Sequence, residues 1–128
     1  MAWKTYDLDK HAQKLVLAAR KRNKDSLNQV FKMRAACAYG LERFWGEQLR
    51  LQNDADKAKY WGDTWKVLVE ILSTAGLKLP NDPATGANVE TMAQKLWSLP
   101  LDDQRQALAV LTQLCDCMVW WTQRYKQV

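Results

Sequence analysis

Apolar residues recur at alternating spacings of three and four positions along most of this chain, and this spacing limits the possible folds more than any other feature. Near the C-terminus the series is Ala107, Leu111, Leu114, Met118, Trp121 and Tyr125. Such a series forms a heptad seam on a helix, whereas the strict alternation typical of strands is absent. The length of 128 residues is common for one domain. We therefore expect an all-α protein, a compact single-domain bundle of about five helices.

Turn and capping signals divide the chain into three parts. Residues 1–76 are expected to form a basic three-helix part, residues 77–88 a loop rich in Pro and Gly, and residues 89–128 a C-terminal helix pair. The first helix should run from residue 7 into the stretch RKRNKD. The others are expected over 27–51, 55–75, 89–98 and 102–125, with Gly76 as the C-cap of the third. In the second of these five helices, Gly40 and Gly46 favour a kink or close packing.

The net charge of +5 is unevenly distributed. Residues 1–50 contain 11 Lys and Arg against 5 Asp and Glu, whereas residues 51–128 contain 8 against 9. A basic half joined to a nearly neutral half suggests one surface for a polyanion and another for packing or for partners. Solvated lysines that maintain solubility would produce the same imbalance.

The basic residues of the first half have helical spacing, and Lys10, Lys14, Lys21 and Lys24 form a lysine stripe on one side of the expected first helix. On the expected second helix, basic residues and one tyrosine lie opposite the apolar side, and the tyrosine offers a ring on which an unpaired base could stack. This pattern suits sequence-tolerant binding of a single strand, although a solvated helix face has a similar pattern. The candidate nucleic-acid-binding residues are Lys10, Lys14, Arg20, Lys21, Lys24, Lys32, Tyr39, Arg43 and Arg50.

Trp120, Arg124 and Arg34 are candidates for partner contacts. Neighbouring helical residues point about 100° apart, so with Trp121 in the apolar seam, Trp120 falls on the polar side beside Arg124. It is then either partly covered by the short fourth helix or offered to a partner. Arg34 falls in the middle of an apolar side. There it requires a carboxylate, such as Glu42 or one across the core, or a contact with nucleic acid or another subunit.

No set of residues indicates catalysis, a metal site or a cofactor. The only histidine, His11, lies among charged residues, and no Gly-rich phosphate loop is present. Cys37, Cys115 and Cys117 lack the spacing of a zinc site and are expected to be reduced thiols. No apolar run is long enough for a membrane span and no signal peptide is evident. We expect a cytoplasmic protein that is not an enzyme and does not bind membranes.

The expected last helix contains Thr112 and then Trp121-x-x-Arg124-Tyr125, after the stretch ALAVL and an aspartate-rich start. This arrangement resembles the closing helix of the small all-helical subunit of type III-B CRISPR effector ribonucleoprotein complexes. The matching motifs cover about a quarter of the chain.

A weaker similarity to the same family lies in the expected second helix. The pair Gly40-Leu41 follows a basic first helix, as in the family. The family usually has an asparagine before this pair, where this chain has Tyr39.

The resemblance implies a non-catalytic subunit that stacks inside a crRNA-guided complex and holds the target strand with basic residues. Its partners would be single-stranded RNA or DNA and the other subunits of the complex, with self-association among copies of the chain. The alternative is a helical protein-interaction module, such as an adaptor or a phage-encoded inhibitor, whose basic half docks on an acidic partner. Small subunits of other CRISPR complexes are a further alternative.

Overall fold

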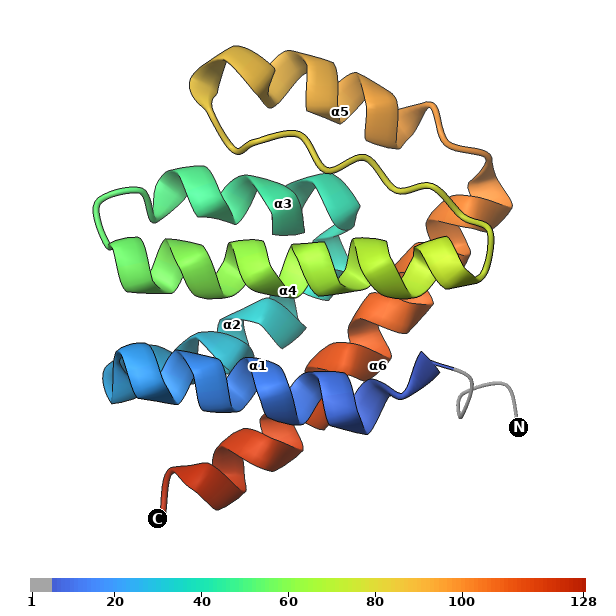
Figure 1. Cartoon of the computed structure of the whole chain (residues 1–128). Coiled ribbons are helices and arrows are strands. Elements are labelled where there is room, and N and C mark those ends of the chain that lie inside the picture. The colour runs from blue at the N-terminus through green and yellow to red at the C-terminus, as the bar shows by residue number, and fades with distance from the viewer. Residues whose placement is uncertain (1–5) are drawn as a thin grey trace.

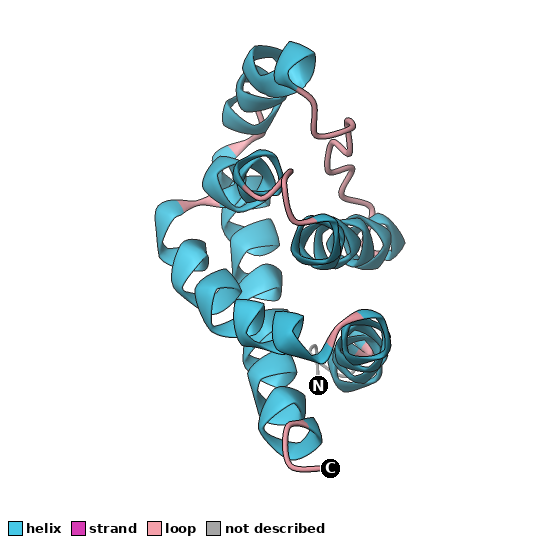
Figure 2. Ribbon diagram, turned by 90° about the vertical axis from the view of Figure 1, so that its left-hand side faces the viewer, coloured by secondary structure: helices cyan, strands magenta, loops and turns pink. Residues whose placement is uncertain are grey.

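The structure is a computed structural model that describes residues 6–128. These residues form six α-helices and three short 3-10 helices, and Figure 2 shows no strand among them. The α-helices are α1 (Leu8–Arg22), α2 (Gln29–Ala36), α3 (Leu41–Arg50), α4 (Ala55–Thr74), α5 (Val89–Trp97) and α6 (Leu101–Tyr125). The 3-10 helices are η2 (Lys24–Asn28), η3 (Cys37–Tyr39) and η4 (Gly86–Asn88). The prediction of a compact all-α bundle is confirmed. No helix of the described part is long and apolar enough to cross a membrane.

The helices share one hydrophobic core, to which both halves of the chain contribute. In Figure 1, α4 lies between α1 and α3, α5 lies beyond α3, and α6 runs diagonally across α1 and α2. The centre of the core is aromatic: the Phe44 ring lies 4.8 Å from the Trp61 ring and 6.3 Å from the Trp65 ring, measured between centroids. All three side chains are buried. Because α6 packs chiefly on α1 and α2, the C-terminal helix belongs to the same core as the basic half.

The prediction of one helix over 27–51 is wrong, because Gly40 separates α2 and η3 from α3. Gly40 has φ 99° and ψ 175°, a conformation open essentially only to glycine, and its carbonyl accepts the first α3 hydrogen bond, from Phe44 N. The apolar residues Cys37 and Leu41 keep a helical spacing across the break since both face the same core. Spacing alone therefore could not locate the break.

Replacing Gly40 by alanine should lower the free energy of unfolding by about 1–3 kcal/mol, because a Cβ at this φ is strained although no atom lies near it. Gly46 is a matched control inside α3. A Cβ there would meet Glu42 Oε1 at 3.6 Å, an ordinary contact, so Gly46→Ala should leave stability unchanged or raise it by up to about 1 kcal/mol. Urea unfolding followed by circular dichroism measures both changes. Equal effects of the two substitutions would contradict the assignment of strain to Gly40.

Two buried tryptophans hold the segment after α4 against the core. The indole of Trp65 donates to the carbonyl of Pro80 (3.0 Å), and the indole of Trp45 donates to the carbonyl of Asp82 (3.2 Å). The segment also buries the side chains of Leu77 and Leu79. As predicted, Gly76 follows the end of α4 in the left-handed region, with φ 80°. The expected loop 77–88 is thus irregular up to η4 but is held against α3 and α4, below α5 (Figure 1).

Candidate nucleic-acid interface

The predicted lysine stripe lies on the outer side of α1. Lys10, Lys14, Lys21 and Lys24 are exposed, whereas Arg20 is partly buried. None of these five cations has a carboxylate within 4.0 Å in the part of the chain that the structure describes. Their charge is therefore not neutralised by the protein itself.

One end of the stripe borders an open depression. Arg20, Lys21 and Lys24 line it together with the exposed side chain of Leu17, and its volume is about 520 Å³. Lys24 lies beyond the end of α1, in η2, and so is not on the same helix as the other lysines. It still lines the same depression, since only Asn23, in an extended conformation, separates it from the last residue of α1.

A chain of contacts joins this side of α1 to the exposed side of α6. Gln13 Nε2 donates to the Tyr125 hydroxyl (2.9 Å), and the Tyr125 ring stacks on Trp121 at 5.8 Å between centroids. The Arg124 guanidinium lies 5.9 Å from the Trp121 ring and 4.6 Å from the Trp120 ring. Contacts of this kind between a cation and an aromatic ring hold an arginine in place while it stays charged.

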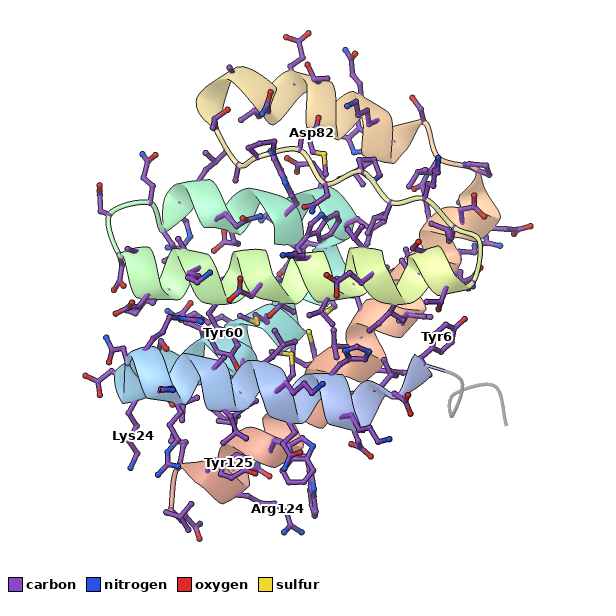
Figure 3. All side chains as sticks on the ribbon, viewed as in Figure 1. Tyr6, Lys24, Tyr60, Asp82, Arg124 and Tyr125 are labelled. Atoms are coloured by element: carbon purple, nitrogen blue, oxygen red, sulfur yellow. The ribbon has the colours of Figure 1, made fainter. Side chains whose placement is uncertain are left out.

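Leu17 and Arg20 follow Gln13 on the same side of α1. Figure 3 accordingly shows Lys24, Arg124 and Tyr125 along one edge of the molecule. We call the surface formed by Arg20, Lys21, Lys24, Trp120 and Arg124 the α1–α6 face.

The adjacent tryptophans differ in their surroundings. Trp121 is partly buried and packs against the core, whereas 53% of Trp120 is exposed. The first alternative for Trp120, coverage by the fourth helix, is wrong: α5 packs on α3, at the other end of the molecule from the C-terminal end of α6 (Figure 1). Arg124 is the side chain that covers part of the Trp120 ring.

Arg34 on α2 forms an ion pair with Asp116 on α6, and the pair lies at the surface rather than in the core. The carboxylate partner expected across the fold is present, but 43% of the Arg34 side chain is exposed, so its predicted place amid an apolar side is wrong. The buried side of α2 contains Val30 and Met33, whereas Phe31, which was expected on the apolar side, is 42% exposed, so Arg34 lies at the edge of the buried side. The hydrogen bond to Asp116 raises the pKa of Arg34 above its usual value.

The remaining candidates lie away from the α1–α6 face. Lys32 is exposed on α2, and Arg50 pairs with Glu47 on α3 (2.7 Å). The Arg43 guanidinium lies 5.1 Å from the ring of Tyr39, which is 69% exposed. The expected alignment of these four residues along one helix is wrong because the helix is broken at Gly40. Since α4 separates α3 from α1 (Figure 1), the nine predicted residues do not form one surface.

Two exposed residues near these surfaces, Lys126 and Trp97, were not predicted. Lys126 Nζ lies 5.7 Å from the Phe31 ring and donates to Asn28 Oδ1 (2.8 Å), which extends the basic character of α6 toward α2. Trp97, 68% exposed, lines a groove of about 330 Å³ with Tyr39 and Arg43. The sequence could have indicated the exposure of Trp97, because it directly follows Leu96, which is buried, and adjacent helical residues cannot both face one core.

Among residues 6–128 no three His, Cys, Asp or Glu side chains form a group that could hold a metal ion. His11 is partly exposed on α1 beside Lys14 and Glu70, which line the same shallow groove.

Comparison of the chain with known protein families, with curated protein sequences and with solved structures finds no match.

Proposed function

We propose that the protein is a non-catalytic helical subunit that binds single-stranded nucleic acid through the α1–α6 face, within a crRNA-guided CRISPR effector complex in the cytoplasm. One observation carries the proposal: Lys24, which lines a depression together with Lys21, lies at the same edge of the molecule as Arg124, whose guanidinium contacts the exposed Trp120 ring. Both lysines are exposed and unpaired among the described residues. Cations beside an exposed aromatic ring suit a phosphate backbone with unstacked bases.

The resemblance to the type III-B small subunit supports the more specific part of the proposal. Of the four residues that carry it, Trp121, Arg124 and Tyr125 belong to the contacts that join α6 to α1. The fourth, Thr112, donates its hydroxyl to the Leu108 carbonyl (2.8 Å) within α6. Three of the four matching residues thus lie in the part of α6 that contacts α1 and holds Arg124.

Binding of labelled single-stranded RNA and single-stranded DNA, measured by fluorescence anisotropy at several salt concentrations, tests the proposal. We expect affinity to fall steeply with salt, by a slope of about 0.7 per phosphate contact in a logarithmic plot. Affinity that does not change with salt, or no binding of either strand, would contradict it. Purification with the products of neighbouring genes, followed by analysis of the copurifying RNA, tests the assignment to an effector complex.

The second candidate function is a protein-interaction module that docks on an acidic partner, and the exposure of Trp120 beside Arg124 favours it. Tryptophan and arginine are the side chains that most often dominate binding energy at interface centres. In this case the same face would bind protein, and nucleic-acid affinity would be weak. Self-association through Trp120 would be one form of it.

Replacing Trp120 by alanine should preserve the fold and abolish assembly with the partner or with further copies of the chain. The loss of the exposed ring should change the free energy of unfolding by less than about 0.5 kcal/mol, whereas the loss of an interface anchor costs about 2 kcal/mol or more of binding. Copurification measures assembly with the partner, size-exclusion chromatography measures self-association, and thermal unfolding measures stability. Assembly that is unchanged in Trp120→Ala would exclude Trp120 as an anchor.

A further inference from the structure

Two buried cysteines from distant parts of the chain lie side by side in the core. Cys37 in η3 and Cys115 in α6 have their Sγ atoms 3.9 Å apart, although 78 positions separate them in the sequence. The Cys37 Sγ also lies 3.4 Å from the Met33 carbonyl. Both are free thiols, and neither belongs to the α1–α6 face.

We propose that Cys37 and Cys115 are a redox modification site at which a peroxide produces an intramolecular disulfide. The Cys37 thiolate attacks one oxygen of the peroxide, and the O–O bond breaks, which gives a sulfenic acid on Cys37 and releases hydroxide or the corresponding alkoxide. The Cys115 thiol then loses its proton and attacks the Cys37 sulfur, which expels water. Two thiols and one hydrogen peroxide thereby become one disulfide and two waters, a two-electron oxidation.

The surroundings favour Cys37 as the thiol that reacts first. The hydrogen-bonding contact with Cys115 and the positive charge of Arg34 lower the pKa of Cys37, although its burial opposes them. The same pairing, together with burial, raises the pKa of Cys115 well above its ordinary value. A thiolate is the reactive form, so the two cysteines have distinct roles as attacking and resolving thiols.

The position of Cys37 in the chain allows the sulfur atoms to approach one another. Cys37 opens η3, a three-residue 3-10 segment followed by Gly40, where the backbone already changes direction. Short 3-10 segments are held by weaker hydrogen bonds than α-helices. The bond can therefore form through a shift of η3 and of the two side chains, while α6 stays in place.

The disulfide would join the same two parts of the fold as the Arg34–Asp116 ion pair. Arg34 lies one turn before Cys37, and Asp116 follows Cys115. Oxidation would add a covalent connection between η3 and α6 beside the salt-sensitive one between α2 and α6. The oxidised protein should consequently unfold at a higher temperature than the reduced one.

Treatment of the folded protein with hydrogen peroxide, followed by intact-mass analysis, tests the proposal. We expect a loss of about 2 Da, as for one disulfide, and a fall from three thiols to one in the denatured, non-reduced protein. After alkylation and proteolysis the linked peptides should contain Cys37 and Cys115. A protein that keeps all three thiols, or that gains oxygen without a cross-link, would overturn the proposal, as would a bond to Cys117 or between two chains.

Cys117 provides the matched control. It lies two residues beyond Cys115 on α6 and so points about 200° away from it. Burial and the nearby Asp9 raise the pKa of Cys117 to about 11, which keeps it protonated near neutral pH. We expect Cys117→Ala to form the cross-link like the original chain, and Cys37→Ala and Cys115→Ala to lose it. Peptide mapping of the original chain identifies the linked cysteines without any substitution, so this result does not depend on how well the variants fold.

Discussion

Reversal of charge at Lys21 and Lys24 should weaken the binding of single-stranded RNA by roughly 10- to 100-fold at about 50 mM salt. Both residues are exposed and have no carboxylate partner among residues 6–128, so each is available for a phosphate. The variant Lys21→Glu/Lys24→Glu should also show a smaller salt slope, by about 1.4 for two lost contacts. Fluorescence anisotropy at four or more salt concentrations measures both quantities. The loss should be similar for every sequence, because phosphate contacts carry no base information.

The variant Lys78→Glu/Arg105→Glu is the matched control, since it changes the net charge by the same amount. Lys78 follows α4 and Arg105 lies near the start of α6, and both are exposed. In Figure 1 these segments lie at the opposite end of the molecule from the end of α1. We expect this variant to bind almost as well as the original chain. Equal losses in the two variants would mean that net charge alone attracts the strand, and the α1–α6 face would then have no special role.

The elements of the fold that depend on local pattern could be predicted from the sequence. The apolar stripe of the last helix is buried from Ala107 to Met118, and the four lysines assigned to the first helix are exposed. Helical periodicity determines both, because it specifies which side chains share a side of a helix. Asp54, a residue type that favours the N-cap position, caps α4 by accepting from Lys57 N (3.3 Å).

The predictions that were wrong or missing concern backbone breaks and contacts between helices, which hydrophobic periodicity does not reveal. Gly40 occupies a conformation with positive φ, but the apolar spacing on either side of it continues because α2 and α3 pack on one core. This break separated Lys32 on α2 from Arg43 on α3. The contact between Gln13 and Tyr125 spans 112 positions and depends on how α1 and α6 cross. For this reason the sequence could place Arg20 and Arg124 on polar sides without showing that the two sides adjoin.

The substitution Trp65→Ala should lower the free energy of unfolding by about 3–5 kcal/mol. The ring is buried against Phe44, and its indole nitrogen donates to the carbonyl of Pro80. Alanine would therefore leave a cavity in the aromatic centre of the core and also release the segment after α4. Urea unfolding followed by circular dichroism measures the change. Trp97→Ala is the matched control: this tryptophan is 68% exposed, so its loss should cost less than about 0.5 kcal/mol.

The substitution Trp65→Phe separates the contribution of ring packing from that of the indole hydrogen bond. Trp65→Phe retains most of the buried ring but cannot donate to Pro80, so it should cost about 1–3 kcal/mol, the penalty for a buried acceptor that loses its partner. Its effect should be concentrated in residues 77–85, where amide hydrogen exchange and proteolytic cleavage should become faster while α1 and α6 keep their protection. If Trp65→Phe leaves both the stability and the exchange of this segment unchanged, the indole hydrogen bond does not hold the segment, and packing of Leu77 and Leu79 alone must do so.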